Sequence, residues 1–366
     1  MDNVTTGVRC IRPLDFDVFV GMDVDKRSNA VTVQDGLGLG RSVKMQHSAE
    51  MLLSFMQNHY AGQRAAFVYE AGPTGFGLHD AISAAGYPCL VVAPSLVPSV
   101  RGKRVKTNRL DSVKLATLLR GGQLTGIRVP STKYRELREL TALRNAQVDE
   151  VRSTKFRIKA LLLRNSLEFP EAPASSQWSR RVISSLRSMQ CSTALRFKLD
   201  SLLDDLEWHQ YSALRAQAAL RGMLDGDTEL SESMGYLMSI PGVGWIIASY
   251  TLARVGDWRL LGRSEEMGAF LGLVPSEDST GEDTDRGSIT KCGDPRLRSM
   301  LIQGAWTAIR KDPELRAFYD GIYRRHSRNT AARVAIVAVA RKMAVRMHCV
   351  LRQRRAYQIR IHRTEE

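Results

Sequence analysis

The feature that most restricts the fold is the mixture of strand-like and helix-like segments in the first third of the chain. Short β-branched runs, turns rich in Gly and Pro, and stretches with helical spacing follow one another there. The expected elements are two strands within 17–35 joined by a turn at 26–29, strands at 41–45, 65–69 and 89–92, a helix at 48–60, and a helix after the turn 71–77. Three strands followed by alternating helices and strands predict a mixed α/β domain, which we place at residues 1–128.

Residues 129–234 lack strand-like alternation and instead show Leu, Val and Ile at helical intervals between charged residues. An arc of about 140° on one helix holds seven apolar residues: Leu137, Leu140, Leu143, Val148, Val151, Ile158 and Leu162. A second long helix is expected over 195–223. Two interpretations fit this pair equally well, an antiparallel coiled coil serving as a dimerisation arm and an ordinary helical bundle.

The last region, residues 235–366, is expected to be mainly helical and opens with a helix-hairpin-helix signature. Gly242 and Gly244 lie in a turn between two apolar helical segments. Such glycines allow a backbone to approach a phosphate at a helix N-terminus, and the same turn also serves only to pack two helices. Both roles remain open from the sequence.

The charge of the chain is strongly positive and unevenly distributed. Lys and Arg number 53 against 38 Asp and Glu, which gives a net charge of +15. Residues 286–366 alone hold 19 Lys and Arg against six Asp and Glu. This excess favours a polyanionic partner, nucleic acid above all, over a charge that serves solubility alone.

The cysteines and the apolar runs argue against a disulfide-bonded secreted protein and against a membrane protein. The five cysteines are scattered and form no CxxC pair, which indicates free thiols in a reducing compartment. The longest apolar run, 334–340, is far shorter than the roughly 20 residues that a membrane span requires. No secretory signal pattern is visible in the first thirty residues. We therefore expect a cytoplasmic, nucleoid-associated protein without a membrane partner.

Three carboxylates stand where catalytic metal ligands are found in α/β domains. Asp23 ends the first strand, Glu70 ends a later one, and Asp111 lies near the start of a helix. Carboxylates at neighbouring strand ends can converge on Mg²⁺, which prefers hard oxygen ligands. Two such ions about 4 Å apart would activate the attacking oxygen and stabilise the leaving oxygen in phosphodiester cleavage. A single Asp after a strand often only caps a turn, so the prediction of a metal site depends on all three carboxylates together.

An ordered series of motifs resembles the DEDD transposases of the insertion-sequence one-ten family, the bridge-RNA-guided recombinases. The segments that carry the resemblance are GMDVDK, YEAGPTGFG, KTNRLDS, SIPGVGWIIA and AFLGLVPSEDSTGEDTDRGSITKCGDPRLRSMLIQGAW. The resemblance implies a RuvC-like, ribonuclease-H-like first domain with four acidic metal ligands. It assigns Asp23, Glu70 and Asp111 to three of them.

The third ligand position of that family is occupied here by Asn108. Asn108 and Asp111 are three residues apart and would share one face of a helix. The amide offers a neutral oxygen, so the second metal site is expected to be weaker, through natural variation or an alteration that traps a complex. Asp25 is a poor substitute because it lies beyond the strand end.

The resemblance also implies a nucleophilic serine that forms a covalent bond to DNA. In this chain the corresponding stretch is 275–281, expected as a polar loop, and Ser279 is the first choice. Thr280, directly before a glycine, is the rival, and Ser276 comes third. Without the resemblance Ser279 would be taken for a turn residue.

The expected partners are donor and target double-stranded DNA, a structured bridge RNA implied by the resemblance, and further copies of the chain in a dimer or tetramer. Basic residues beside the metal ligands and in the last region would hold phosphates: Arg101, Lys103, Arg104, Lys106, Arg109, Arg286, Lys291, Arg296 and Arg298. The leading hypothesis is a transposase or site-specific recombinase. The alternatives are a RuvC-like nuclease or junction resolvase that uses water, and a non-catalytic nucleic-acid-binding relative.

Overall fold

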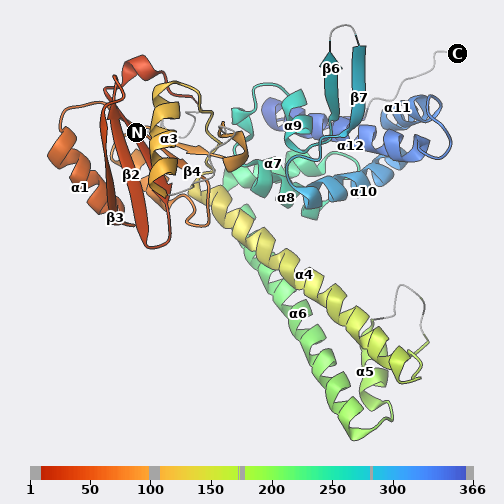
Figure 1. The fold of residues 1–366 in the computed structure, drawn as a ribbon. Helices are drawn as coiled ribbons and strands as arrows, with labels where there is room; N and C mark the ends of the chain where they lie inside the picture. The colour runs from red at the N-terminus through yellow and green to blue at the C-terminus, as the bar shows by residue number, and fades with distance from the viewer. Residues whose placement is uncertain (1–9, 99–107, 172, 174–177, 281–282, 360–366) are drawn as a thin grey trace, which may run out of the picture. The chain divides into compact units, whose positions relative to one another are not determined.

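The computed structural model describes residues 10–98, 108–171, 173, 178–280 and 283–359, and the chain divides into two compact units, 1–131 and 132–366 (Figure 1). The first boundary expected from the sequence, after residue 128, lies close to this division. The second, after residue 234, falls inside the second unit. No helix in the described ranges is long and apolar enough to cross a membrane.

The first unit is a five-stranded sheet with helices on both faces, and it confirms the mixed α/β class that the sequence predicted. Its elements are η2 (Pro13–Asp15), β1 (Val18–Val24), β2 (Ser28–Asp35), β3 (Gly40–Gln46), α1 (Ala49–Tyr60), β4 (Ala65–Glu70), α2 (Gly77–Ala84), β5 (Cys89–Val92), η3 (Pro94–Leu96) and α3 (Asn108–Arg120). The strand order is β3-β2-β1-β4-β5. β1, β2 and β3 are antiparallel neighbours, whereas β4 and β5 continue the sheet parallel to β1.

Alternate residues of the central strands belong to two different cores, because side chains of a strand point to opposite faces in turn. Val20 and Phe67 lie in a core that also contains Leu52 of α1 and Ile82 of α2. Phe19 and Val68, with the opposite parity, pack with Leu115 and Leu119 of α3. The parity of a residue in β1 or β4 therefore tells which face of the sheet its side chain occupies.

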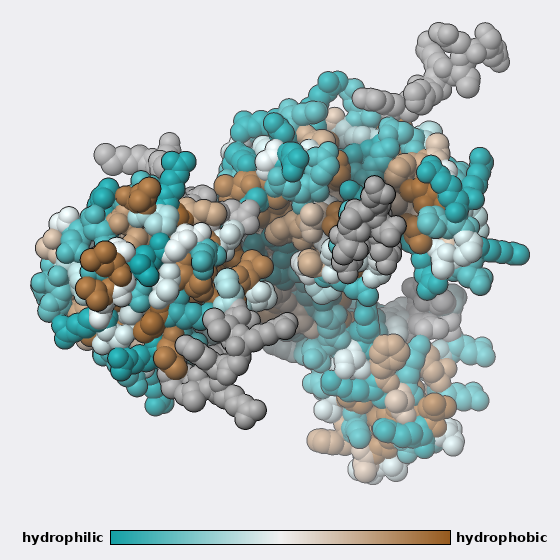
Figure 2. All heavy atoms as spheres, turned by 45° about the horizontal axis from the view of Figure 1, so that its top comes forward, coloured by the Kyte–Doolittle hydropathy of each residue, from teal (hydrophilic) through white to brown (hydrophobic). Residues whose placement is uncertain are grey.

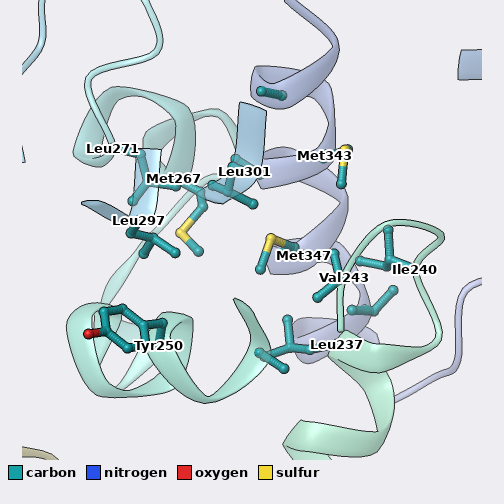
Figure 3. Packing of buried hydrophobic residues seen from close by; sticks show 14 of the residues in the cluster. Leu237, Ile240, Val243, Tyr250, Met267, Leu271, Leu297, Leu301, Met343 and Met347 are labelled. Atoms are coloured by element: carbon teal, nitrogen blue, oxygen red, sulfur yellow. The ribbon is translucent and has the colours of Figure 1, made fainter. Parts of the chain in front are cut away.

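The second unit is helical apart from one ribbon. Its elements are α4 (Thr132–Arg164), α5 (Arg180–Ser188), α6 (Thr193–Asp225), α7 (Thr228–Met238), α8 (Trp245–Val255), η5 (Trp258–Leu260), α9 (Glu265–Phe270), β6 (Pro275–Thr280), β7 (Asp283–Ile289), α10 (Pro295–Lys311), α11 (Pro313–Tyr323) and α12 (Ala331–Gln353). Met343 and Met347 of α12 lie at the centre of a core that includes Leu297 and Leu301 of α10 (Figure 3).

The helices α4 and α6 form an antiparallel pair that extends as an arm (Figure 1). The start of α4 (Leu137) packs with the end of α6 (Leu220), and the end of α4 (Leu162) packs with the first half of α6 (Leu203). The expected apolar stripe was wrong at Leu143, a residue that is 47% exposed. Polar residues replace it in the buried seam, namely Thr141, Asn145 and Thr154. A strict coiled-coil seam remains a prediction.

The surface shows no long apolar stripe on the face drawn in Figure 2, where hydrophobic residues lie in separate patches between hydrophilic ones. Leu14, Leu37 and Leu39 of the first unit are among the exposed apolar residues. On the arm, Phe197, Trp208 and Leu214 of α6 are exposed as well.

Candidate active site

The register of two parallel strands places Asp23 beside Glu70. β1 and β4 pair from Val18 opposite Ala65 to Met22 opposite Tyr69, and the next residue of each strand is the acidic one. Partners in a parallel pair lie on the same face of the sheet. The parity of Asp23 is that of Phe19, and the parity of Glu70 is that of Val68, so both carboxylates belong to the face that α3 covers. Both are half-buried.

The orientation of α3 across this face follows from its contacts with β1 and β2. The backbone of Ser112 and Ala116 lies so close to Gly21 that a Cβ at position 21 would collide with it. The Ser112 hydroxyl lies 2.8 Å from the Thr32 hydroxyl, and Gln34 donates from Nε2 to the Thr117 hydroxyl at 3.1 Å.

Later residues of α3 therefore meet later residues of β2, and the helix runs antiparallel to β1. Its N-terminal turn points towards the end of β1 that carries Asp23.

The first turn of α3 brings Asn108 level with Asp23. Asn108 is four residues before Ser112, on the same side of the helix and about 6 Å nearer the N-terminus. Asp23 is two residues beyond Gly21, a rise of about 6.6 Å. Asp111 lies on the side of Leu115, which packs with Val68 of β4 and Leu90 of β5. The backbone thus brings the four ligand positions implied by the resemblance to one face and one end of the sheet.

The donor set suits a divalent cation in its chemistry, since three carboxylates and one amide oxygen are the hard ligands that Mg²⁺ takes. Among the described residues, however, no three His, Cys, Asp or Glu side chains surround a common point at metal-binding distance. The backbone places the candidate ligands together, and their side chains are not gathered. Asp25 lies just beyond the end of β1, is exposed, and accepts a hydrogen bond from the amide of Lys26 at 2.6 Å.

A lysine that the sequence did not single out lies in the same row of the sheet. Lys44 of β3 pairs with Ala30 of β2, which in turn pairs with Asp23. The Ser42 hydroxyl, 2.9 Å from that of Thr32, shows that this parity of β3 also faces α3. Lys44 is exposed and forms no ion pair with a described acidic residue. Only the register reveals it, because the row runs across three consecutive antiparallel strands.

Most of the basic cluster expected next to the metal ligands lies outside the described residues: Arg101, Lys103, Arg104 and Lys106. Arg109 is described, and it is exposed on the first turn of α3. A phosphate contact by this arginine stays a prediction.

The segment that carries Ser279 is a strand, which corrects the expected loop. β6 pairs with β7 in an antiparallel ribbon with Ser279 opposite Thr284, and residues 278–286 are described by their backbone alone, except that 281 and 282 lie outside the described residues. Ser276 donates its hydroxyl hydrogen to the carbonyl of Ser288 at 2.9 Å and so ties β6 to β7. A ribbon of polar residues has no apolar alternation, so a hydrophobic pattern cannot reveal it.

The stem of this ribbon is packed tightly. Gly272 and Gly293 have positive φ angles of 65° and 72°. A Cβ on Gly272 would collide with the backbone of Cys292, and one on Gly293 with the carbonyl of Phe270. Leu273 is 2% exposed and belongs to the main core of the second unit. The ribbon therefore begins at a fixed place in this unit.

The turn expected to belong to a helix-hairpin-helix is used for packing at one of its two glycines. Gly242 has a φ of 86°, and a Cβ there would collide with the carbonyl of Gly304 in α10. Ile240 and Val243 point into the core next to Met347 (Figure 3). Gly244 is exposed at the N-cap of α8 with nothing within 4 Å of an added Cβ. Phosphate binding at this turn stays a prediction, for which Gly244 is the better placed residue.

Two arginines expected to bind nucleic acid have partners within the second unit. Arg296 donates to Asp149 of α4 at 2.5 and 3.2 Å. Arg298 donates to the carbonyls of Leu271 and Cys292 at 3.0 and 2.8 Å. Lys291 is exposed, and Arg286 belongs to the part of β7 described by its backbone alone. A role in phosphate binding for these four remains a prediction.

Comparison with known proteins identifies relatives along most of the chain. A transposase family of the DEDD type matches residues 20–166, and the family described as transposase IS116/IS110/IS902 matches residues 234–320. A putative transposase of Sinorhizobium fredii is 33% identical over 304 residues, which covers 80% of this chain and 72% of that protein. A transposase for an insertion sequence element of Leptospira borgpetersenii is 23% identical over 90% of this chain and 94% of its own length. One from Coxiella burnetii is 24% identical over 74% and 73%.

Proposed function

The chain belongs to the IS110 family of transposases, enzymes that cut and rejoin DNA, and from that premise we propose a reaction with two chemical parts. The first is a Mg²⁺ site of the two-metal type at the ends of β1 and β4. The second is a covalent bond between DNA and Ser279. The observation that carries the proposal is the register that sets Asp23 beside Glu70 under the N-terminal turn of α3.

The residues that would hold the metal are Asp23, Glu70 and Asp111, with Asn108 as a neutral fourth ligand. When bound, the ions would stabilise negative charge on the phosphate oxygens during cleavage. The Asn108 amide carries no charge, so one of the two sites would be the weaker. Gly21 and the Thr32–Ser112 hydrogen bond would fix the height of α3 and thereby the positions of its two ligands.

In the covalent step the Ser279 oxygen forms a bond to a DNA phosphorus while the bond from that phosphorus to the leaving strand oxygen breaks. The serine gives up its hydroxyl proton, and the leaving oxygen takes up a proton to become a free hydroxyl. One phosphodiester is thus exchanged for another, and the reverse reaction with a different strand completes recombination. The family match across 234–320, which includes Ser279, supports this assignment.

Guidance by a bridge RNA and assembly into a dimer or tetramer are further parts of the proposal. Support comes from the basic excess of residues 286–366 and from the long arm of α4 and α6. RNA recognised through shape and backbone would suit such a surface.

The test is to trap the covalent adduct. The chain, co-produced with the non-coding flanks of its own element, would be incubated with end-labelled DNA and Mg²⁺ and quenched in denaturant. A labelled band at the size of the protein plus DNA is expected for the unaltered chain and for Thr280→Ala, and its loss for Ser279→Ala. Cleaved DNA without any adduct would replace the proposal by a nuclease that uses water. An adduct that survives Ser279→Ala but not Thr280→Ala would move the nucleophile to Thr280.

A further inference from the structure

Three aromatic rings form a continuous row across α10 and α11. The centroids of Trp306 and Tyr319 are 5.9 Å apart, and Tyr319 stacks on Tyr323 at 5.9 Å with an interplanar angle of 27°. Tyr319 is buried at 8% exposure, whereas Trp306 and Tyr323 are 42% and 39% exposed. The row therefore has a buried middle ring that holds two open ends in place.

The row arises from helix spacing and one interhelical contact. Tyr319 and Tyr323 are four residues apart on α11 and share a face. Arg316, one turn earlier, lies 5.9 Å from the ring of Tyr319 and pairs with Asp320 at 3.0 Å. Trp306 comes from the middle of α10, where the backbone carbonyl of this residue accepts a hydrogen bond from Arg310 at 3.1 Å. Large aromatic rings that are exposed to solvent and packed against a buried neighbouring ring are suited to stacking on a planar group of a partner.

The acidic side chains of the same region are already neutralised. Asp312, fully buried, pairs with Arg346 at 2.8 Å. Lys342 donates to Glu314 at 2.8 Å, and this hydrogen bond holds the pKa of Glu314 below its ordinary value. With Asp320 paired as above, no acidic side chain of α11 is left to repel an anion.

The arginines around the row have no such partners. Arg310 follows Trp306 by one turn, and an exposed segment after Tyr323 contains Arg324, Arg325 and Arg328. None of these four forms an ion pair with an acidic residue in the ranges that the structure describes. Strong positive charge, on α10 and on the segment that follows α11, therefore flanks the exposed aromatic rings.

We propose that this surface, the rings of Trp306, Tyr319 and Tyr323 with their flanking arginines, binds a single-stranded stretch of nucleic acid. Unpaired bases stack on the exposed faces of Trp306 and Tyr323, and the arginines hold the phosphates. A duplex keeps its base faces inside its own stack, so it can use only the arginines. The proposal is independent of the metal site and of Ser279.

The experiment compares single-stranded and duplex binding in the full chain. Fluorescence anisotropy would measure affinity for labelled oligo(dT) and oligo(U) of about 12 nucleotides, within the usual size of such sites, and for a duplex of matched length. The variant is Trp306→Ala with Tyr323→Ala. The matched control is Trp208→Ala with Tyr211→Ala, another exposed aromatic pair, 6.3 Å apart on α6.

The double variant should weaken single-strand binding by about 5- to 150-fold for each base that stacks and leave duplex binding within twofold. The control variant should bind single strands and the duplex as the unaltered chain does. Trp306→Phe should retain most of the single-strand affinity, because Phe keeps an aromatic ring at this position. A loss of affinity confined to oligo(U) would identify the ligand as RNA. An equal loss for oligo(dT) and oligo(U) would mean that the surface binds by base stacking alone and does not distinguish RNA from DNA. Equal weakening of duplex and single strands, or no weakening of either, would overturn the proposal, with thermal melting as the check that the variant is folded.

Discussion

The candidate metal ligands and the candidate nucleophile lie on two different kinds of β structure. Asp23 and Glu70 end central strands of a sheet that is buried on both faces. Ser279 lies in a two-stranded ribbon, a structure that has little stability of its own without packing against other elements. Interior packing fixes the backbone at Asp23 and Glu70, whereas the ribbon is fixed at its stem, by Gly272, Leu273 and Gly293. The comparison indicates that the two sites should respond differently to changes in packing.

The largest effect is expected from Gly21→Val. The added side chain would collide with the backbone of Ser112 and Ala116, so α3 must move off the sheet. We expect a loss of about 1–3 kcal/mol in the free energy of unfolding, or more, together with complete loss of DNA cleavage. Thermal melting and a cleavage assay would measure both. Gly36→Ala, where nothing lies within 4 Å of the added Cβ, is the control and should be near neutral.

Next come Asp23→Asn and Glu70→Gln, which remove charge without changing size. Metal ions supply several kcal/mol of transition-state stabilisation, so cleavage should fall about 100-fold or more. The melting temperature should hold or rise slightly, because like charges at neighbouring strand ends repel each other in the absence of metal. If either variant fails to fold, these carboxylates have a structural role, and the proposed difference between the metal site and the ribbon does not hold.

Gly272→Ala tests the other side of the comparison. The methyl group would collide with the backbone of Cys292 at a residue whose φ is 65°, so the stem of the ribbon must shift. We expect the covalent adduct to be lost while metal binding to the first unit, measured by calorimetry, is unchanged. Normal adduct formation would show that the stem does not determine where Ser279 lies.

The sequence predicted the first unit well for physical reasons. Its strands alternate or run apolar, its turns carry Gly and Pro, and the ends of neighbouring parallel strands must meet at one edge, so Asp23 and Glu70 could be paired in advance. The face of the sheet, the height of α3 and the presence of Lys44 needed the register. In the second unit the ribbon is polar and has no apolar pattern, and in the arm buried polar residues such as Thr141 and Asn145 interrupt the apolar stripe, so Leu143 was misplaced. Ser279 was reached through resemblance alone.

Asn108→Asp should sharpen the metal side of the comparison. The change adds a negative charge one helical turn from Asp111, at the height of Asp23. Ligand charge strongly tunes the affinity of carboxylate sites, and we expect metal to bind about tenfold more tightly. Titration with Mn²⁺ followed by electron paramagnetic resonance would show the gain. An unchanged titration with unchanged cleavage would mean that position 108 does not reach the metal.

The smallest predicted effect concerns Lys44, the exposed end of the row that contains Asp23. Ala30, the residue between them, is small and leaves the lysine room to extend towards a phosphate held at the carboxylates. Exposed ion pairs contribute up to about 1 kcal/mol, so Lys44→Ala should reduce cleavage by up to about fivefold and Lys44→Arg should retain it. Arg41→Ala is the matched control, since Arg41 is an exposed cation on the same strand with the opposite parity. The defect of Lys44→Ala should shrink at high salt, because solvent ions screen such a contact. If Arg41→Ala lowers cleavage as much as Lys44→Ala does, the effect comes from general positive charge on the edge strand. The position of Lys44 in the same row as Asp23 would then make no contribution to cleavage.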